Sequence, residues 1–433
     1  MNRALTLKKV NIGDIRIKKS ASNFIYIQIF YLMVVFFLRD VLGLPSMITY
    51  ITDVIMVLAF ICCLKRVQKS MSAAQAKVQF YIICAIIFFV CVGAIANAAD
   101  PLLFVWGARN NLRFFIFFLS CVVLLDFKDV SNIFKMLMVF FWLNVVVMTV
   151  EYFVFGLRQD YLGGLFGIAQ GCNAYTNILL CFVLCYKVSQ YFKANTSLLN
   201  LALYVVAILY LAVLVELKIV YVEFLLILVV SLLINRPNFK TILIIILGTI
   251  GVALAIWLLS VYDPKTLEFF FELDQIEYYL SGGGYTNSGD LNRFTAIAQI
   301  QEMFFSGSWI NTLFGFGLGS CDTSSFAFLQ SDFFNQYEYL HYRWFSHAWV
   351  YLEQGAIGLI LLVLFFVFIL FYCIKHRRTN SNGYMLTAFL FTITTIIGII
   401  YNCALELEAS YLIAVVSAVP FIIIKSAKKD RVC

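Results

Sequence analysis

Long apolar runs recur along the whole chain, and they restrict the fold more than any other feature of the sequence. A helix crosses the hydrocarbon layer of a bilayer, about 30 Å thick, with roughly 20 mostly apolar residues, because each residue rises about 1.5 Å. The pattern predicts twelve such spans, at residues 24–38, 47–64, 78–99, 112–127, 133–155, 174–192, 198–217, 219–235, 240–262, 347–374, 384–405 and 409–424. We therefore expect an all-α polytopic membrane protein.

The composition excludes a water-soluble domain. Hydrophobic residues make up 63% of the chain and charged residues 13%, whereas soluble domains carry roughly 25% charged residues. The net charge of +7 does not indicate a nucleic-acid partner, because the Lys and Arg residues stand in short clusters between apolar runs and not on one patch. The twelve cysteines lie mostly inside apolar runs without the spacing of a zinc site, so we interpret them as small apolar side chains.

Basic residues gather in alternate connections, which predicts the orientation of the chain. Cytoplasmic connections of membrane proteins are enriched in Lys and Arg. Here the enriched connections hold Lys8, Lys9, Arg16, Lys18 and Lys19; Lys65, Arg66, Lys69 and Lys77; Lys128 and Lys135; Lys187 and Lys193; Arg236 and Lys240; Lys375, Arg377 and Arg378; and Lys425, Lys428, Lys429 and Arg431. We expect both termini in the cytoplasm, with residues 1–22 and 426–433 as cytoplasmic tails.

The longest polar interval, residues 263–346, separates nine predicted spans within 23–262 from three within 347–425. It holds ten acidic residues against Lys265, Arg293 and Arg343. Apolar residues recur at helical spacing from Phe269 to Leu280 and again from Phe294 to Phe304, so we expect two amphipathic helices along the membrane surface. The stretch 281–285 (Ser-Gly-Gly-Gly-Tyr) predicts a flexible turn between them. We expect this interval to form one large loop outside the cytoplasm.

Two ionisable residues follow this loop. His347 stands where the chain re-enters the membrane, and an imidazole suits proton transfer near neutral pH; the alternative is an interfacial histidine satisfied by water. Glu353 lies six residues further, about 9 Å deeper along a helix. A carboxyl group at that depth is costly unless it faces a polar cavity or has a partner, and we expect one of the two.

Arginines in the non-cytoplasmic connections point to an anionic ligand. The donor fork of Arg293 matches phosphate oxygens in two-point contacts. Arg109 and Arg113 share a face if that segment is helical, which would double the positive potential. The alternatives are an interfacial anchor for Arg293 and charge balance with the acidic loop for the other two.

Closely spaced glycines occupy residues 315–320 (Gly-Phe-Gly-Leu-Gly-Ser). No lysine follows them, so they do not form a nucleotide P-loop. They predict either a tight turn that brings backbone N–H groups toward a substrate or a plain loop.

Taken together, three motifs over roughly residues 160–365 resemble those of the O-antigen polymerase and O-antigen ligase superfamily. The first is the glycine- and phenylalanine-rich stretch 163–175, which includes Asn173. The second is Arg293 followed by Phe-Gly-x-Gly-x-Gly at 314–319, and the third is Ser346-His347-Ala348 leading to Glu-x-Gly-x-x-Gly at 353–358. Where the family often has Ser-Arg, this chain has Leu217-Lys218, which keeps the charge and loses the fork.

The resemblance implies a metal-independent glycosyltransferase on the periplasmic face of the bacterial inner (plasma) membrane. Its donor would be an undecaprenyl-diphosphate-linked oligosaccharide, with no cofactor and no nucleic acid. Its other contacts would be membrane lipids, and a flippase and a chain-length regulator of the same pathway.

The same resemblance assigns roles to individual residues. Arg293, together with Arg109, Arg113 or Lys218, would stabilise the diphosphate leaving group. His347 would accept the proton of the attacking hydroxyl, and Glu353 would orient His347 if the helix bends or a water intervenes. Asn173 and Arg343 complete the predicted substrate contacts.

Two related activities and one unrelated activity remain as alternatives. A polymerase and a ligase share the leaving group, but the polymerase extends another lipid-linked repeat unit and the ligase uses the lipid A core. The phenylalanine-rich spans and loosely drawn outer motifs favour the polymerase. A flippase would not need so large an outer loop. Whether Cys172 and Cys321 form a disulfide also stays open.

Overall fold

The computed structural model describes residues 12–235, 239–262, 289–379 and 383–430, together with residues 277, 280, 284 and 285. These parts of the chain are helical and contain no β-strand. The long helices are α1 (Ile12–Asp40), α2 (Ile51–Cys63), α4 (Lys77–Ala96), α5 (Pro101–Leu124), α6 (Phe127–Phe153), α7 (Asn173–Phe192), α8 (Leu198–Leu214), α9 (Lys218–Ile234), α10 (Phe239–Tyr262), α16 (Ser346–Lys375), α17 (Tyr384–Tyr401) and α18 (Ser410–Asp430). Each overlaps one predicted span.

The protein is a helical membrane protein. Within the described residues, eight helical segments are long and apolar enough to cross a bilayer: 21–40, 46–73, 77–96, 101–124, 127–153, 346–375, 384–401 and 410–428. The second of these combines α2 with short flanking 3₁₀ turns and α3 (Val67–Ala73). The count of twelve spans stays a prediction.

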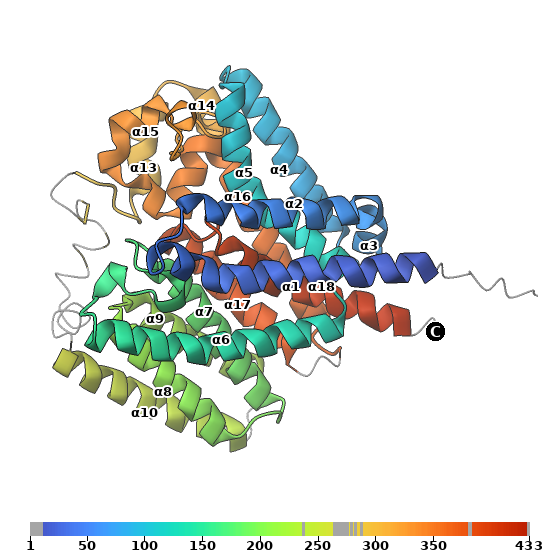
Figure 1. Cartoon of the computed structure of the whole chain (residues 1–433), viewed down its shortest axis with the longest axis vertical. Coiled ribbons are helices and arrows are strands. Elements are labelled where there is room, and N and C mark those ends of the chain that lie inside the picture. Colours follow the sequence, from blue (N-terminus) through green and yellow to red (C-terminus); the bar gives the residue numbers. More distant parts are fainter. Residues whose placement is uncertain are drawn as a thin grey trace, which may run out of the picture.

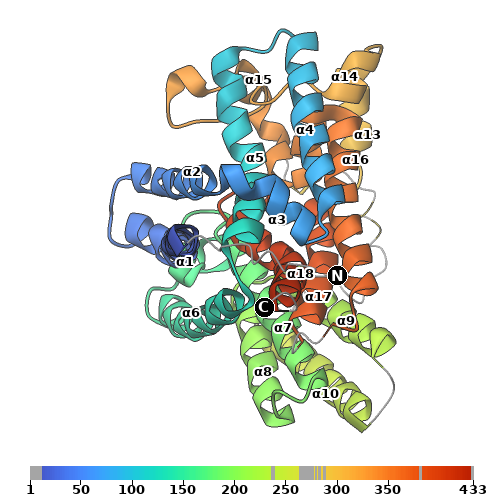
Figure 2. The ribbon, with the colours of Figure 1, turned by 90° about the vertical axis from the view of Figure 1, so that its right-hand side faces the viewer.

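The helices are unequally buried within the bundle. In their most apolar windows, 83% of residues 410–428 and 78% of residues 101–124 are buried inside the protein, against 28% for residues 46–73. Helices α5 and α18 pack against each other, and α17 packs on α7 and α16. Figures 1 and 2 both place α4 and α5 at one end of the molecule and α8 and α10 at the other. Helices α5 and α18 are therefore the most enclosed by other helices, whereas α2 is largely exposed on the outside of the bundle.

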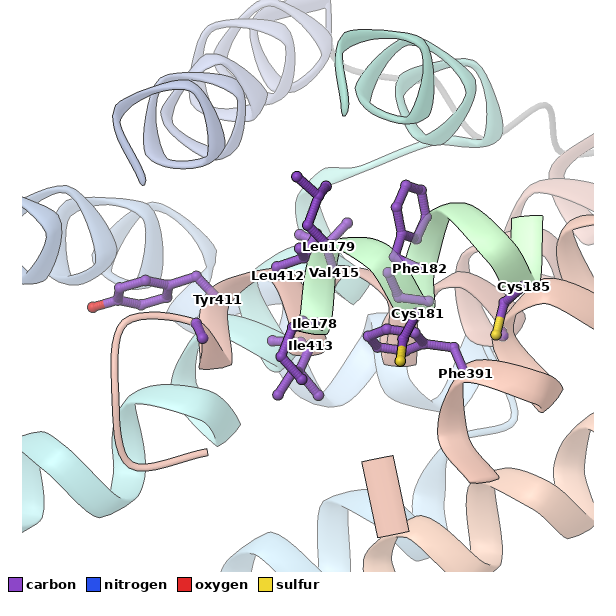
Figure 3. Packing of buried hydrophobic residues seen from close by; sticks show 14 of the residues in the cluster. Ile178, Leu179, Cys181, Phe182, Cys185, Phe391, Tyr411, Leu412, Ile413 and Val415 are labelled. Carbon is purple, nitrogen blue, oxygen red and sulfur yellow. The ribbon is translucent and has the colours of Figure 1, made fainter. Parts of the chain in front are cut away.

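Helices α7, α17 and α18 form the core seen in Figure 3. From α7, Ile178, Leu179 and Phe182 pack toward Leu412 to Val415 of α18, and Phe391 reaches the same cluster from α17. All of these side chains are 5% exposed or less. Lipid tails are as apolar as these residues, so close packing and not water exclusion holds such helices together.

Helix α5 begins at Pro101, eleven residues before the predicted span 112–127. Asp100 caps it, since its carboxylate accepts hydrogen bonds from the N–H groups of Leu102 (2.7 Å) and Leu103 (3.2 Å). The prediction started too late because polar residues interrupt the apolar run at 109–113. This correction places Arg109 and Arg113 inside a regular helix.

Helix α17 ends at Tyr401, four residues before the predicted end of the span 384–405. The segment 402–409 between α17 and α18 is not helical. Its backbone turns at Asn402, whose side-chain oxygen accepts a hydrogen bond from the N–H of Ala404 at 3.0 Å. The turn brings Glu406 and Glu408 into the interior, where the apolar pattern had predicted the end of one span and the start of the next.

The described part of the large loop folds into short helices with a hydrophobic cluster of its own. They are α13 (Ala296–Ile300), a π-helical turn (Gln301–Phe305), α14 (Trp309–Phe314) and α15 (Asp332–Tyr337), which Figure 1 shows together beside α16. The second predicted amphipathic helix thus exists as α13 with its π-helical turn, and it buries Ala296, Ile300 and Phe305. The first predicted helix, from Phe269, and most of the turn at 281–285 lie outside the described residues.

Candidate active site

The glycine-rich segment 315–320 packs backbone to backbone on α16. Gly315 and Gly355 both adopt left-handed conformations, with φ 69° and φ 64°. The N–H of Phe316 donates to the carbonyl of Leu352 (2.8 Å), and the N–H of Gly317 donates to that of Glu353 (3.0 Å). Helix α16 is therefore kinked at Gly355, and two of the three motifs behind the family resemblance form one structural unit.

Only glycine fits at this contact. A Cβ atom on Gly315 would lie 2.4 Å from the carbonyl carbon of Glu353, and one on Gly355 would lie 2.4 Å from that of Leu313. The same holds where the segment meets α5, because a Cβ on Gly107 would lie 2.1 Å from the nitrogen of Gly319. These glycines allow the backbones to touch.

Glu353 is paired, as expected for an acid at this depth, but it does not orient His347. One carboxylate oxygen accepts hydrogen bonds from the N–H groups of Gly319 (3.0 Å) and Cys321 (3.3 Å), and the other accepts one from the Asn111 amide (3.0 Å). The residue is 1% exposed. Glu353 thus holds the glycine-rich segment against α16, and its predicted place among the catalytic residues stays a prediction.

His347 and Arg293 come together, 54 residues apart in the chain. The Nε2 atom of His347 lies 2.7 Å from the carbonyl oxygen of Arg293, and Nδ1 lies 3.2 Å from that of Ile399. The imidazole thus joins the loop to the end of α17. To accept a proton from a substrate, one ring nitrogen must first separate from its carbonyl, so the predicted base role stays a prediction.

The guanidinium of Arg293 lies within a cage of aromatic rings. Its Cζ atom is 4.5 Å from the ring centroids of Tyr285 and Tyr401 and 5.0 Å from that of Phe345, distances at which a cation is attracted to a ring face. Burial lowers the pKa of this guanidinium, while Tyr401 acts in the opposite direction. The cage holds a positive charge beside His347.

Lys218 is the first residue of α9, and this helix end reaches the same region. The hydroxyl of Tyr401 lies next to the backbone of Ile219, and the Tyr401 ring in turn contacts Arg293. Tyr401 therefore links the start of α9 to the aromatic cage. Sequence reasoning gave no sign of this tyrosine, because it ends an ordinary apolar span.

Arg109 and Arg113 share one face of α5, but carboxylates neutralise them. Arg109 donates to Asp53 of α2 at 2.7 Å, and Arg113 donates to Glu408 at 2.8 Å. The hydroxyl of Tyr175 donates to the other oxygen of Glu408 at 2.8 Å. The alternative of charge balance was right about the pairing and wrong about its source, because the acids come from α2 and segment 402–409 and not from the large loop. The predicted substrate contacts of the two arginines stay a prediction.

The two remaining predicted contacts also have partners within the protein. The side-chain amide of Asn173 donates to Asp160, and the Arg343 guanidinium lies 3.4 Å from Asp322. Asp322 is fully buried, and burial raises its pKa while Arg343 and an amide of α5 oppose that shift. Arg343 and Asn173 therefore do not converge with Arg293 on one substrate in the contacts described.

The first motif is held in the same way as the glycine-rich segment. Glu151 accepts a hydrogen bond from the N–H of Gly164 at 2.8 Å, and Asn144 accepts one from that of Leu165 at 2.7 Å. Cys172 and Cys321 are free thiols, both buried, which answers the question of a disulfide. The acids Glu151, Glu406 and Glu408 were missed, although a carboxyl group within or beside an apolar run is itself the signal for a buried partner.

Comparison with known protein families and curated proteins found no match to this chain. The resemblance to the polymerase and ligase superfamily therefore rests on the motifs.

Proposed function

We propose that this protein polymerises undecaprenyl-diphosphate-linked oligosaccharide repeat units into O-antigen or a related surface polysaccharide. The reaction takes place on the periplasmic face of the inner membrane. The observation that carries the proposal is the contact between the His347 imidazole and the backbone carbonyl of Arg293, because it brings together residues of two separate motifs.

In the proposed reaction a sugar hydroxyl of the acceptor attacks the anomeric carbon of the donor from the side opposite the diphosphate. The new C–O bond forms as the bond from carbon to the phosphate oxygen breaks, so the configuration inverts. His347 takes the hydroxyl proton after leaving the Arg293 carbonyl. The electron pair departs with undecaprenyl diphosphate.

Positive charge is needed where the diphosphate leaves. Arg293 supplies it from the aromatic cage, and Lys218 supplies a second charge from the start of α9. Arg109 and Arg113 keep α2, α5 and segment 402–409 together through their ion pairs. We assign them to positioning, and we assign Glu353 to the same role.

A deletion of the gene tests the proposed function. Loss of a polymerase leaves lipopolysaccharide with a single repeat unit, because transfer to the core continues. Bare core without any repeat unit would contradict the proposal and favour the ligase or the flippase. The measurement is an electrophoretic ladder of lipopolysaccharide from the deletion strain and from the complemented strain.

Two substitutions test the residues. We expect His347→Ala and Arg293→Ala each to abolish chain growth in the complemented strain while the protein accumulates in the membrane. Arg158→Ala is the matched control, because Arg158 is an exposed arginine whose contacts within the described part of the chain are with neighbouring backbone and Tyr152. Full ladders from either of the first two variants would remove that residue from the proposed mechanism.

A further inference from the structure

A pocket opens beside the start of α16, on the loop side of segment 402–409. It encloses a cavity of about 240 Å³, slightly below the roughly 300–1,000 Å³ typical of small-ligand sites. Trp344 and Trp349 contribute aromatic surface, and Cys403 and Leu407 line it from segment 402–409. None of the steps proposed above uses this pocket.

The pocket wall carries a flat aromatic surface held in place. The rings of His341 and Trp344 stack in parallel, with centroids 4.1 Å apart and an interplanar angle of 1°. Trp344 is 36% exposed. His341 adopts a left-handed backbone conformation, φ 50° and ψ 28°, which is strained for a residue with a side chain and which recurs at ligand sites. The aromatic pair is thus fixed before any ligand binds.

Polar groups surround this aromatic surface, and their charges are nearly balanced. Arg343 lies over the Trp349 ring at 4.3 Å and 3.4 Å from Asp322. Glu338 also lines the pocket, so two carboxyl groups accompany one guanidinium. Such a site does not attract a diphosphate, but it offers donors and acceptors to a ligand with many hydroxyl groups.

We propose that this pocket binds a neutral or amino sugar of the accepting oligosaccharide, with the apolar face of the sugar ring on Trp344 and its hydroxyl groups on Glu338, His341 and Arg343. The proposal rests on the proposed function. Trp344 lies three residues before His347 in the chain, and Trp349 lies two residues after it. The diphosphate of the donor belongs on the Arg293 side of α16.

Binding of a defined oligosaccharide tests the pocket. The probe is the repeat-unit oligosaccharide released by mild acid from the lipid-linked repeat units of the producing bacterium, titrated calorimetrically into the purified full chain in detergent. We expect Trp344→Ala to raise the Kd about tenfold, as for loss of an aromatic contact, and Glu338→Gln to raise it by about threefold. Trp309→Ala is the control, because Trp309 is 69% exposed on α14 and does not line the pocket.

The outcomes separate this proposal from the function on which it rests. An unchanged Kd for Trp344→Ala or for Glu338→Gln, or competition by inorganic pyrophosphate, overturns the pocket assignment. If Trp344→Ala does not fold, as judged by its melting curve, Glu338→Gln at the exposed rim decides alone. Normal polymer in the deletion strain combined with a weakened Kd for the variants would refute the polymerase and leave the sugar site standing.

Discussion

Glu406 and Glu408 lie only two residues apart, but their surroundings shift the pKa values of their carboxyl groups in opposite directions. Burial raises the pKa of Glu406 to about 8, and the hydrogen bond from Ser346 offsets this only in part. Burial would also raise the pKa of Glu408, but the contact with Arg113 outweighs it and lowers the pKa to about 2. At neutral pH, Glu406 is therefore largely protonated and Glu408 is ionised.

The raised pKa of Glu406 makes stability fall as the pH rises. Between about pH 4.5 and 8 the unfolded chain gives up this proton while the folded chain keeps it, so the unfolded state is favoured by an amount on the order of 5 kcal/mol at most. We expect Glu406→Gln to remove this dependence. Its melting temperature in detergent should exceed that of the wild type at pH 8 and equal it at pH 4.5.

The matched control for that substitution is Glu302→Gln, since Glu302 is exposed on the loop. The control should melt like the wild type at both pH values. If Glu406→Gln gives no gain at pH 8, Glu406 does not carry a buried proton.

At the residue scale the sequence predicted that Glu353 would be paired, because the cost of an acid in an apolar span demands a partner. It did not predict which atoms would be the partners. The partners are backbone N–H groups of a loop more than 30 residues away and the side-chain amide of Asn111 on α5. Backbone groups are the same in every residue, so a sequence pattern cannot reveal them as partners. The partner of Arg113 was missed for a different reason: Glu408 stood at the predicted junction of two spans.

At the scale of elements, the kink of α16 and the glycine-rich segment depend on each other. The kink frees the carbonyls of Leu352 and Glu353 from intrahelical hydrogen bonding, and Phe316 and Gly317 take them up. A helix interrupted inside a membrane requires such outside donors. The two motifs therefore belong to one structural element, although nearly forty residues separate them.

Substitution of Gly315, which packs against α16, should lower the stability of the protein more than substitution of Gly43, which has open space around it. Gly315→Ala and Gly43→Ala both place a side chain at φ near +70°, but nothing lies within 4 Å of a Cβ on Gly43. We expect Gly43→Ala to cost about 1–2 kcal/mol from backbone strain. Gly315→Ala should cost about 1–3 kcal/mol more from overpacking.

The measurement is the denaturation midpoint of each variant in the same detergent. Equal midpoints for the two variants would mean that a side chain at position 315 fits between the glycine-rich segment and α16. That result would contradict the close packing described above.

The apolar pattern predicted the locations of the helices better than it predicted their ends. The long helices all overlap predicted spans because the thickness of a bilayer fixes their length. The predicted start of α5 and the predicted end of α17 were wrong. Polar residues at 109–113 and 402–408 can lie inside the protein because ion pairs and hydrogen bonds satisfy them. Hydropathy is computed from the local sequence, so it cannot show that a polar residue has a partner on a distant helix.

On the scale of the whole molecule, a chain of polar contacts crosses the bundle. Asp53 of α2 binds Arg109 of α5; the neighbouring Asn110 binds Asp322 of the loop; and Asp322 binds Arg343. The arrangement ties the large loop to α5 through Asn110 and Asp322, which are both buried. These contacts hold the loop against α5.

The orientation of the loop is open to a direct test. A reporter enzyme that is active only in the cytosol, inserted after Ser324 in the large loop, should be inactive, because residues 263–346 are expected outside the cytoplasm. The same reporter inserted after Arg378, beside a predicted cytoplasmic cluster, should be active. Activity at the first position would end the case for a periplasmic glycosyltransferase.

The close packing of these glycines predicts which of them evolution should conserve. Because a Cβ on Gly107 would strike Gly319, and one on Gly319 would lie 1.8 Å from the carbonyl oxygen of Leu103, a change at one position cannot be absorbed by the other. Homologous sequences that keep this architecture should retain glycine at 107, 315, 319 and 355 even where the surrounding motif has drifted, and they should lose these glycines together where the bend of α16 has been lost.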